Sequence, residues 1–160
     1  MLIPIYYVLM SCKCEEAYRL VFEHIKVDSG GKLDMHSAMH DFEMAIINAV
    51  ASVFNPAFHT GCFFHMKQAL RAKMVDYKFS SEFIREHLPL FDFLTVCERS
   101  RLATGVEFIR HKVLSGKTAT KDEKMWFEDY LDTYFKKFWL TEKVIQMFNY
   151  NSVEEWKAEL

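Results

Sequence analysis

The chain has 160 residues, of which 51% are hydrophobic and 26% are charged. This composition excludes an intrinsically disordered protein, and the length fits one globular domain better than two. Five glycines and three prolines exclude a collagen-like repeat and disfavour a turn-rich β-sandwich. The formal net charge of −2 provides no overall attraction to nucleic acid or to an anionic membrane, so any basic surface must be local.

The N-terminal apolar run predicts a strand over residues 2–10 that is buried on both faces, because it is rich in Ile, Tyr, Val and Leu without a helical period. It has no positive n-region and contains Pro4, so a secretory signal peptide is the weaker alternative. No run approaches the roughly 20 apolar residues that span a bilayer, which predicts a soluble protein without a membrane partner. Four sparse cysteines favour reduced thiols over a disulfide framework.

Strands and helices alternate in the first half of the chain. Apolar residues at three- and four-residue spacing predict a helix over residues 12–26. A weak strand is expected over 33–40, followed by a helix over 42–54 that stops before Asn55-Pro56. The segment AFHTGC predicts another short strand, and a helix follows over 63–75. This alternation favours an α/β layer fold.

From Phe79 onward only helices are expected. They cover residues 80–87, 91–99, 103–114 and 121–139. The last helix has Thr118 or Thr120 as its N-cap, and a terminal helix begins at Asn151 or Ser152. An aromatic stripe on the 121–139 helix predicts core packing rather than a ligand site; it comprises Phe127, Tyr130, Leu131, Tyr134 and Phe138.

An acidic pair, Asp41 and Glu43, lies where the second predicted strand ends and a helix begins. Ligands and metals gather at this edge of an open α/β sheet, and a carboxylate there suits Mg²⁺ or Mn²⁺. The alternative role for Asp41 is a helix cap, which is the commoner one for an aspartate at a helix start. Two nearby histidines, His36 and His40, are treated as incidental.

A second motif, GCFFH, places Cys62 and His65 three residues apart on one helical face. A Cys-x₂-His pair can ligate zinc, but a structural zinc site needs four ligands. Without a second such pair, a packed cysteine and a hydrogen-bonded histidine are the more frequent outcome. Lys67, Arg71 and Lys73 follow on the same helix and are candidate contacts for DNA phosphates.

Four segments occur in an order and spacing typical of one family: Pro4–Leu9, Lys13–Tyr18, Asp41–Ala49 and Gly61–Gln68. They resemble the catalytic domain of the Mutator-like element (MULE) transposases, a family often paired with FLYWCH-type zinc fingers. The resemblance covers residues 1 to about 75.

The tail can be aligned with the closing segment of the family. Asn151, Glu154 and Trp156 match its Asn, Glu and aromatic positions, whereas Tyr150 and Lys157 replace an Asn and a His.

The resemblance implies an α/β, ribonuclease H-like (integrase-type) fold and an Asp-Asp-Glu triad that binds two Mg²⁺ or Mn²⁺ ions for DNA cleavage and strand transfer. Asp41 would be the second catalytic, metal-binding member and Glu154 the third. Residues 1–76 would form a partial core, 77–140 an all-helical insertion, and 141–160 a return to the core. The resemblance further implies DNA as partner, a possible homo-oligomer and a nuclear location.

The first aspartate of the triad has no counterpart, because no acidic residue precedes Cys14. We therefore expect a chain that is truncated at its N-terminus, lacks the first strands of the sheet and does not cleave DNA. Two hypotheses stay open at this point. The chain is either a degenerate DNA-processing enzyme domain or a non-catalytic module that binds DNA or other proteins.

Overall fold

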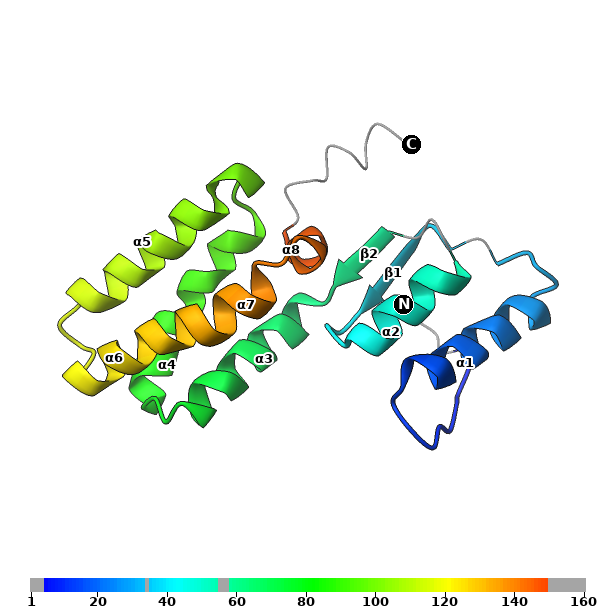
Figure 1. The fold of residues 1–160 in the computed structure, drawn as a ribbon, viewed down its shortest axis with the longest axis horizontal. Coiled ribbons are helices and arrows are strands. Elements are labelled where there is room, and N and C mark those ends of the chain that lie inside the picture. Colours follow the sequence, from blue (N-terminus) through cyan, green and yellow to red (C-terminus); the bar gives the residue numbers. More distant parts are fainter. Residues whose placement is uncertain (1–4, 34, 55–57, 150–160) are drawn as a thin grey trace. The chain divides into compact units, whose positions relative to one another are not determined.

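The computed structural model describes residues 5–33, 35–54 and 58–149, and it divides the chain into two compact units (Figure 1). The first, the strand-bearing unit, is Met1–Thr60, and the second, the helical unit, is Gly61–Leu160. The boundary expected from the sequence lay at residue 76. Helix α3 (Phe63–Asp76) therefore belongs to the helical unit, because it packs on the 3₁₀ helix η1 (Leu88–Thr95).

In the strand-bearing unit, the described residues form two helices and a pair of strands. Helix α1 (Glu15–Asp28) precedes β1 (Ser37–His40), α2 (Met44–Val53) and β2 (Phe58–Gly61). The strands form a two-stranded parallel sheet, joined through α2 (Figure 1). These elements confirm the helices and short strands predicted between residues 12 and 62, because local periodicity and the breaks at SGG and Asn-Pro were read directly from the sequence.

Helix α1 packs against α2 through aromatic and polar contacts. The ring centroids of Phe22 and Phe54 lie 6.0 Å apart in an edge arrangement. Lys26 Nζ donates a hydrogen bond to the Val53 carbonyl at 2.8 Å, and Asn48 Nδ2 donates to Glu15 Oε2 at 2.9 Å. The aromatic contact and the Lys26 bond thus join the ends of α1 and α2, and the Asn48 bond joins the start of α1 to the middle of α2.

The strand expected over residues 2–10 is wrong for the part that the structure describes. Residues 5–10 form no strand, and Ile5, Tyr7 and Leu9 are largely exposed instead of buried. A strand is stable only when its backbone pairs with a neighbour, and within the described residues the sheet pairs β1 with β2 alone. The apolar composition of this segment predicted a buried strand, but a buried strand needs a neighbouring strand to pair with, and composition does not reveal one.

The helical unit is built from short helices. After α3 and η1 its elements are α4 (Ser81–His87, between α3 and η1), η2 (Arg99–Arg101), α5 (Leu102–Ser115), α6 (Lys121–Asp129), the π-helical turn η3 (Tyr130–Phe135), α7 (Lys136–Trp139) and α8 (Glu142–Phe148). The helix expected over 91–99 is a 3₁₀ helix with Pro89 in its first turn. The terminal helix expected from Asn151 lies outside the described residues.

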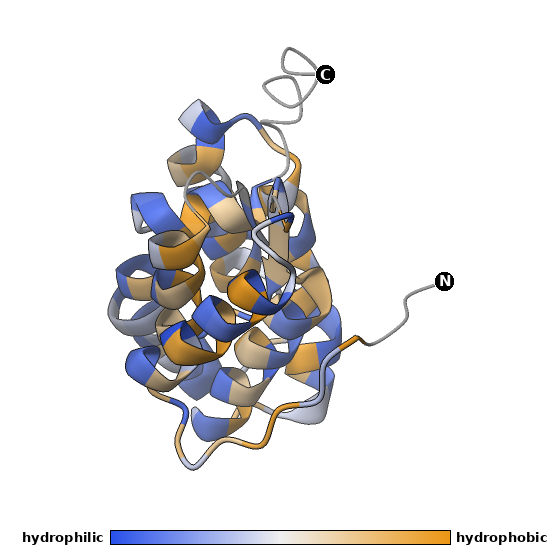
Figure 2. Ribbon diagram, turned by 90° about the vertical axis from the view of Figure 1, so that its right-hand side faces the viewer, coloured by the Kyte–Doolittle hydropathy of each residue, from blue (hydrophilic) through white to orange (hydrophobic). Residues whose placement is uncertain are grey.

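An aromatic core fills the helical unit, as the stripe on residues 121–139 predicted. Phe79 and Phe83 stack with centroids 4.4 Å apart, and Phe91 and Phe135 lie 4.8 Å apart. The π-helical turn changes which residues face this core. The buried set is Phe127, Tyr130, Leu131, Phe135 and Trp139, whereas the predicted Tyr134 and Phe138 are only half-buried. Bands of hydrophobic and hydrophilic residues alternate along the helices (Figure 2).

Thr120 begins α6 with a capping box. Its hydroxyl accepts a hydrogen bond from the Glu123 amide at 3.2 Å, and Glu123 Oε2 accepts from the Thr120 amide at 3.0 Å. Glu123 Oε1 also accepts from the Ser80 hydroxyl at 2.7 Å, which links α6 to the start of α4. These bonds lower the pKa of Glu123 although its burial alone would raise it.

The sheet of the described residues has two strands, so the expected ribonuclease H-like fold stays a prediction. Across those same residues, no helix combines the length and the apolar character that crossing a bilayer requires.

Candidate functional site

The carboxyl end of β1 carries the acidic pair predicted from the sequence. Asp41 directly follows the strand, and its Oδ1 accepts a hydrogen bond from the Glu43 amide at 3.1 Å. Glu43 is the N-cap residue of α2, but its side chain accepts no bond from the first turn of the helix. Asp41 therefore braces the turn that leads into α2, a role close to the helix cap weighed above.

Tyr18 of α1 reaches this acidic pair. Its hydroxyl donates a long hydrogen bond of 3.4 Å to Glu43 Oε2, and Lys13 Nζ lies 3.8 Å from the same oxygen. Desolvation raises the pKa of the Tyr18 phenol, and the charge of Glu43, its hydrogen bond and the charge of Asp41 raise it further. The phenol therefore stays protonated at neutral pH and acts as a donor toward the carboxylates.

His40 and His59 form a pair beside the acidic edge. His40 is the last residue of β1 and is 8% exposed, and His59 lies on β2. Their ring nitrogens, His40 Nε2 and His59 Nδ1, are 3.0 Å apart. Sequence reasoning dismissed His40 and did not consider His59. The signal that could have found the pair is the strand–helix–strand pattern, which places residues of the two strands side by side.

The described residues do not supply the ligand set that two catalytic ions would need. Across them, no group of three or more His, Cys, Asp or Glu side chains could hold a metal ion. Asp41 and Glu43 lie together, but Glu43 is already engaged by Tyr18 and Lys13. Glu154, the predicted third carboxylate, lies outside the described residues. The carboxylates present here therefore do not fit a complete site for Mg²⁺ or Mn²⁺.

Cys62 and His65 lie at the start of α3, in the helical unit. Cys62 is the half-buried N-cap residue, and its thiol makes no capping bond. His65 is exposed, and its ring centroid is 5.9 Å from that of Phe64. Within the described part of the chain neither residue joins a cluster of three metal-ligating side chains. Zinc binding by this pair stays a prediction.

The three basic residues of α3 differ in their surroundings. Lys67 forms an ion pair with Asp92 and donates to the Leu88 carbonyl at 3.1 Å, so its charge is used inside the helical unit. Lys73 lies 3.8 Å from Asp76, and Arg71 is exposed. Of the three, Arg71 and Lys73 are thus better placed than Lys67 to meet a phosphate.

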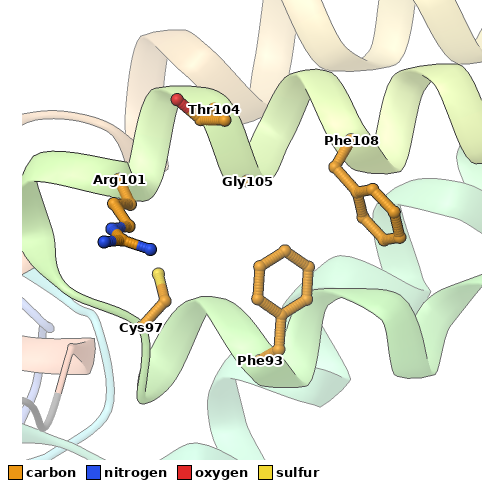
Figure 3. A pocket seen from close by; sticks show the side chains of 6 residues that line it. All are labelled: Phe93, Cys97, Arg101, Thr104, Gly105 and Phe108. Carbon is orange, nitrogen blue, oxygen red and sulfur yellow. The ribbon is translucent and has the colours of Figure 1, made fainter.

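An apolar pocket of about 280 Å³ lies between η1 and α5 (Figure 3). It is lined by Phe93, Cys97, Arg101, Thr104, Gly105 and Phe108. Burial raises the pKa of the Cys97 thiol, which makes it a poor nucleophile at neutral pH. Arg101 Nε is paired with Glu98 Oε2 at 2.9 Å. The pocket therefore suits an apolar group and contributes no reactive side chain.

Comparison with known families bears on the first of the two units and the start of the second. The family model described as the MULE transposase domain matches residues 1–69, which include Asp41, His59, Cys62 and His65. No curated protein matches the chain, and no solved structure does. The resemblance predicted from the sequence motifs is confirmed. Residues 1–69 are therefore similar to the MULE transposase domain, a match that covers less than half of the 160-residue chain.

Proposed function

We propose that this protein is a transposase-related domain that associates with DNA and does not itself cleave it. The observation that carries the proposal is the family match over residues 1–69, together with the position of Asp41 at the carboxyl end of β1. This is the edge of a parallel sheet at which polar ligands bind in open α/β folds.

DNA cleavage in the family rests on three carboxylates that hold two divalent ions. In the proposal, Asp41 retains the place of the second carboxylate and Glu154 that of the third. The loss of cleavage is supported by the Glu43 carboxylate, which is engaged by Tyr18 and Lys13. The bond of Glu43 to Asp41 comes from its backbone amide and not from this carboxylate.

DNA contact in the proposal comes from α3, through Arg71 and Lys73. Arg71 is exposed, and the half-buried Lys73 has its ammonium 3.8 Å from Asp76 and over the rings of Tyr77 and Tyr134. Each phosphate contact that a cation makes renders the slope of log affinity against log salt more negative by about 0.9 on duplex DNA. The near-neutral net charge means that a few such local contacts must supply most of the affinity.

A salt titration of DNA binding tests this interface. Fluorescence anisotropy with a labelled duplex measures the slope of log affinity against log salt. Arg71→Gln and Lys73→Gln should each reduce the magnitude of this slope by about 0.9. Lys112→Gln, which removes an exposed lysine of α5, is the matched control and should leave the slope unchanged. Equal slopes for all four proteins would rule out α3 as the DNA-binding element, and an absence of binding at low salt would contradict the proposal itself.

A nicking assay tests the lack of cleavage. Supercoiled plasmid incubated with the full chain and Mn²⁺ should remain uncut, as it does with Asp41→Asn. Cleavage by the unaltered chain that Asp41→Asn abolishes would show an active enzyme instead.

A further inference from the structure

Two of the four cysteines, Cys12 and Cys14, lie on the segment that leads into α1 and are separated by a single residue. Both are exposed free thiols, whereas Cys62 and Cys97 are half-buried. Because the chain extends by at most about 3.6 Å per residue, the Cα atoms of the pair are no more than roughly 7.2 Å apart. A disulfide needs Cα atoms within about 7 Å, so this pair can be bridged with little movement of the backbone.

The two thiols differ in their surroundings. Cys14 is the N-cap residue of α1, a helix of 14 residues, and so lies at the positive end of the helix dipole. A hydrogen bond from Cys12 lowers the pKa of Cys14 and raises that of Cys12, while the charge of Glu16 acts on Cys14 in the opposite direction as the weakest influence. Because the thiolate is the reactive form, Cys14 is the nucleophile of the pair and Cys12 is its neighbouring thiol.

We propose that Cys12 and Cys14 are a redox modification site that closes into a reversible disulfide by exchange with a low-molecular-weight disulfide such as glutathione disulfide. The Cys14 thiolate attacks one sulfur of the oxidant, forms a mixed disulfide and releases one glutathione thiolate. Cys12 then loses its proton to solvent and attacks the Cys14 sulfur, which breaks the mixed disulfide and releases the second glutathione. The two cysteines are oxidised by two electrons, the oxidant is reduced by two, and an excess of thiol reverses both steps.

Lys13, between the two cysteines, connects this site to the acidic edge. Its ammonium lies 3.8 Å from Glu43 Oε2, and its side chain is 79% exposed. Closing the disulfide makes Lys13 the middle residue of a small ring, which restricts its backbone. Because an exposed ion pair of this kind is weak, we expect ring closure to displace the ammonium from Glu43 and so change the charge beside the Asp41 turn. The inference concerns thiol chemistry and does not rest on the proposed function.

Oxidation of the full chain by glutathione disulfide tests the site. After incubation, the remaining thiols are blocked with N-ethylmaleimide in denaturant, and a protease that cuts after glutamate releases residues 1–15 as one peptide. Mass spectrometry should find this peptide unblocked and two hydrogens lighter than its dithiol form, while Cys62 and Cys97 carry the blocking group. Dithiothreitol should restore blocking of both cysteines in the peptide. In NMR spectra, the backbone amides of Asp41 and Glu43 should shift between the reduced and oxidised states.

Single serine variants separate the roles of the two thiols. Cys12→Ser should accumulate the mixed disulfide of Cys14 with glutathione, and Cys14→Ser should form one at Cys12 about tenfold more slowly. Cys62→Ser is the matched control and should close the disulfide at the parental rate. Equal rates in the first two variants would overturn the role of Cys14 as nucleophile.

Two further results would contradict the proposal. Complete blocking of Cys12 and Cys14 after oxidation, or mixed disulfides at both without ring closure, would overturn the modification site itself. Ring closure that leaves the amides of Asp41 and Glu43 unshifted would overturn its link to the acidic edge.

Discussion

The two compact units differ in how much core they have of their own. The helical unit fully buries large aromatic side chains, among them Phe91, Phe127, Tyr130 and Trp139. In the strand-bearing unit, α1 has no buried residue, and the buried apolar side chains of α2 and its cap are mostly small or aliphatic. The family match and the acidic edge nevertheless fall mainly in the strand-bearing unit. In this chain, the region that carries the candidate chemistry is therefore the one with the thinner core.

The largest expected effect on this contrast comes from Phe127→Ala. Phe127 is fully buried, so truncation should lower the free energy of unfolding of the helical unit by about 3–5 kcal/mol. Leu9→Ser, at a fully exposed leucine of the strand-bearing unit, should stay within about 0.5 kcal/mol. Chemical denaturation measures the change in the free energy of unfolding for both variants, and hydrogen exchange shows which unit each variant destabilises. Equal loss of protection in α1 and α2 after Phe127→Ala would show that the units unfold as one.

Asn149→Ala should have the next largest effect. Asn149 is 1% exposed, and its Nδ2 donates to the carbonyls of Leu94 and Cys97 at 2.8 and 2.9 Å. The substitution leaves the Leu94 and Cys97 carbonyls without the hydrogen bonds from Nδ2, which should lower the free energy of unfolding by about 1–3 kcal/mol. Exchange should rise in α8 and η1 but not in α1. A change below 0.5 kcal/mol would mean that water replaces the donor.

Thr120→Ala should destabilise α6 by about 1 kcal/mol through loss of the capping box. The lowered pKa of Glu123 adds a pH dependence. Its stabilising contribution is present above the ordinary carboxyl value of 4.5 and is lost as the pH falls through the lowered pKa. Between pH 7 and pH 3, the free energy of unfolding should therefore fall less for Glu123→Gln than for the parent. Parallel pH curves would contradict this assignment.

Tyr130→Phe should be the smallest change, neutral or slightly stabilising. The Tyr130 hydroxyl is fully buried and has no hydrogen-bond partner within the structure described, so the phenylalanine removes a desolvated group without removing a bond. Burial also raises the pKa of this phenol well above its usual value. A loss of more than 1 kcal/mol in denaturation would reveal a partner for the hydroxyl.

Local patterns in the sequence were sufficient for most helices and for the Thr120 cap, because spacing and capping chemistry act over a few residues. The exposed segment 5–10 was mispredicted because strand formation depends on a distant partner. The same limit applies to the site. Asp41 was found from its place in a motif. The contact of Tyr18 with Glu43 and that of His59 with His40 depend instead on tertiary packing.

The surface ion pairs around Arg110 were also beyond sequence reasoning. Arg110 of α5 binds Asp132 at 2.6 Å and lies 3.5 Å from Glu128, and Lys136 binds Asp132 at 3.0 Å. The Lys136–Asp132 pair and the pair of Arg110 with Glu107 on α5 have sequence spacings that predict contact on one helix. The others depend on the packing of α5 against α6, which no local rule specifies.

The π-helical turn at Tyr130–Phe135 has a consequence for chain length. Its i→i+5 bonding holds one residue more than an α-helical turn would. Deleting one residue there would restore a uniform α-helical period and leave Phe135 and Trp139 on the face that packs into the core. Because the buried side chains after the turn keep their register, this stretch of the helix offers a place where the gene can lose a codon and still encode a packed interior.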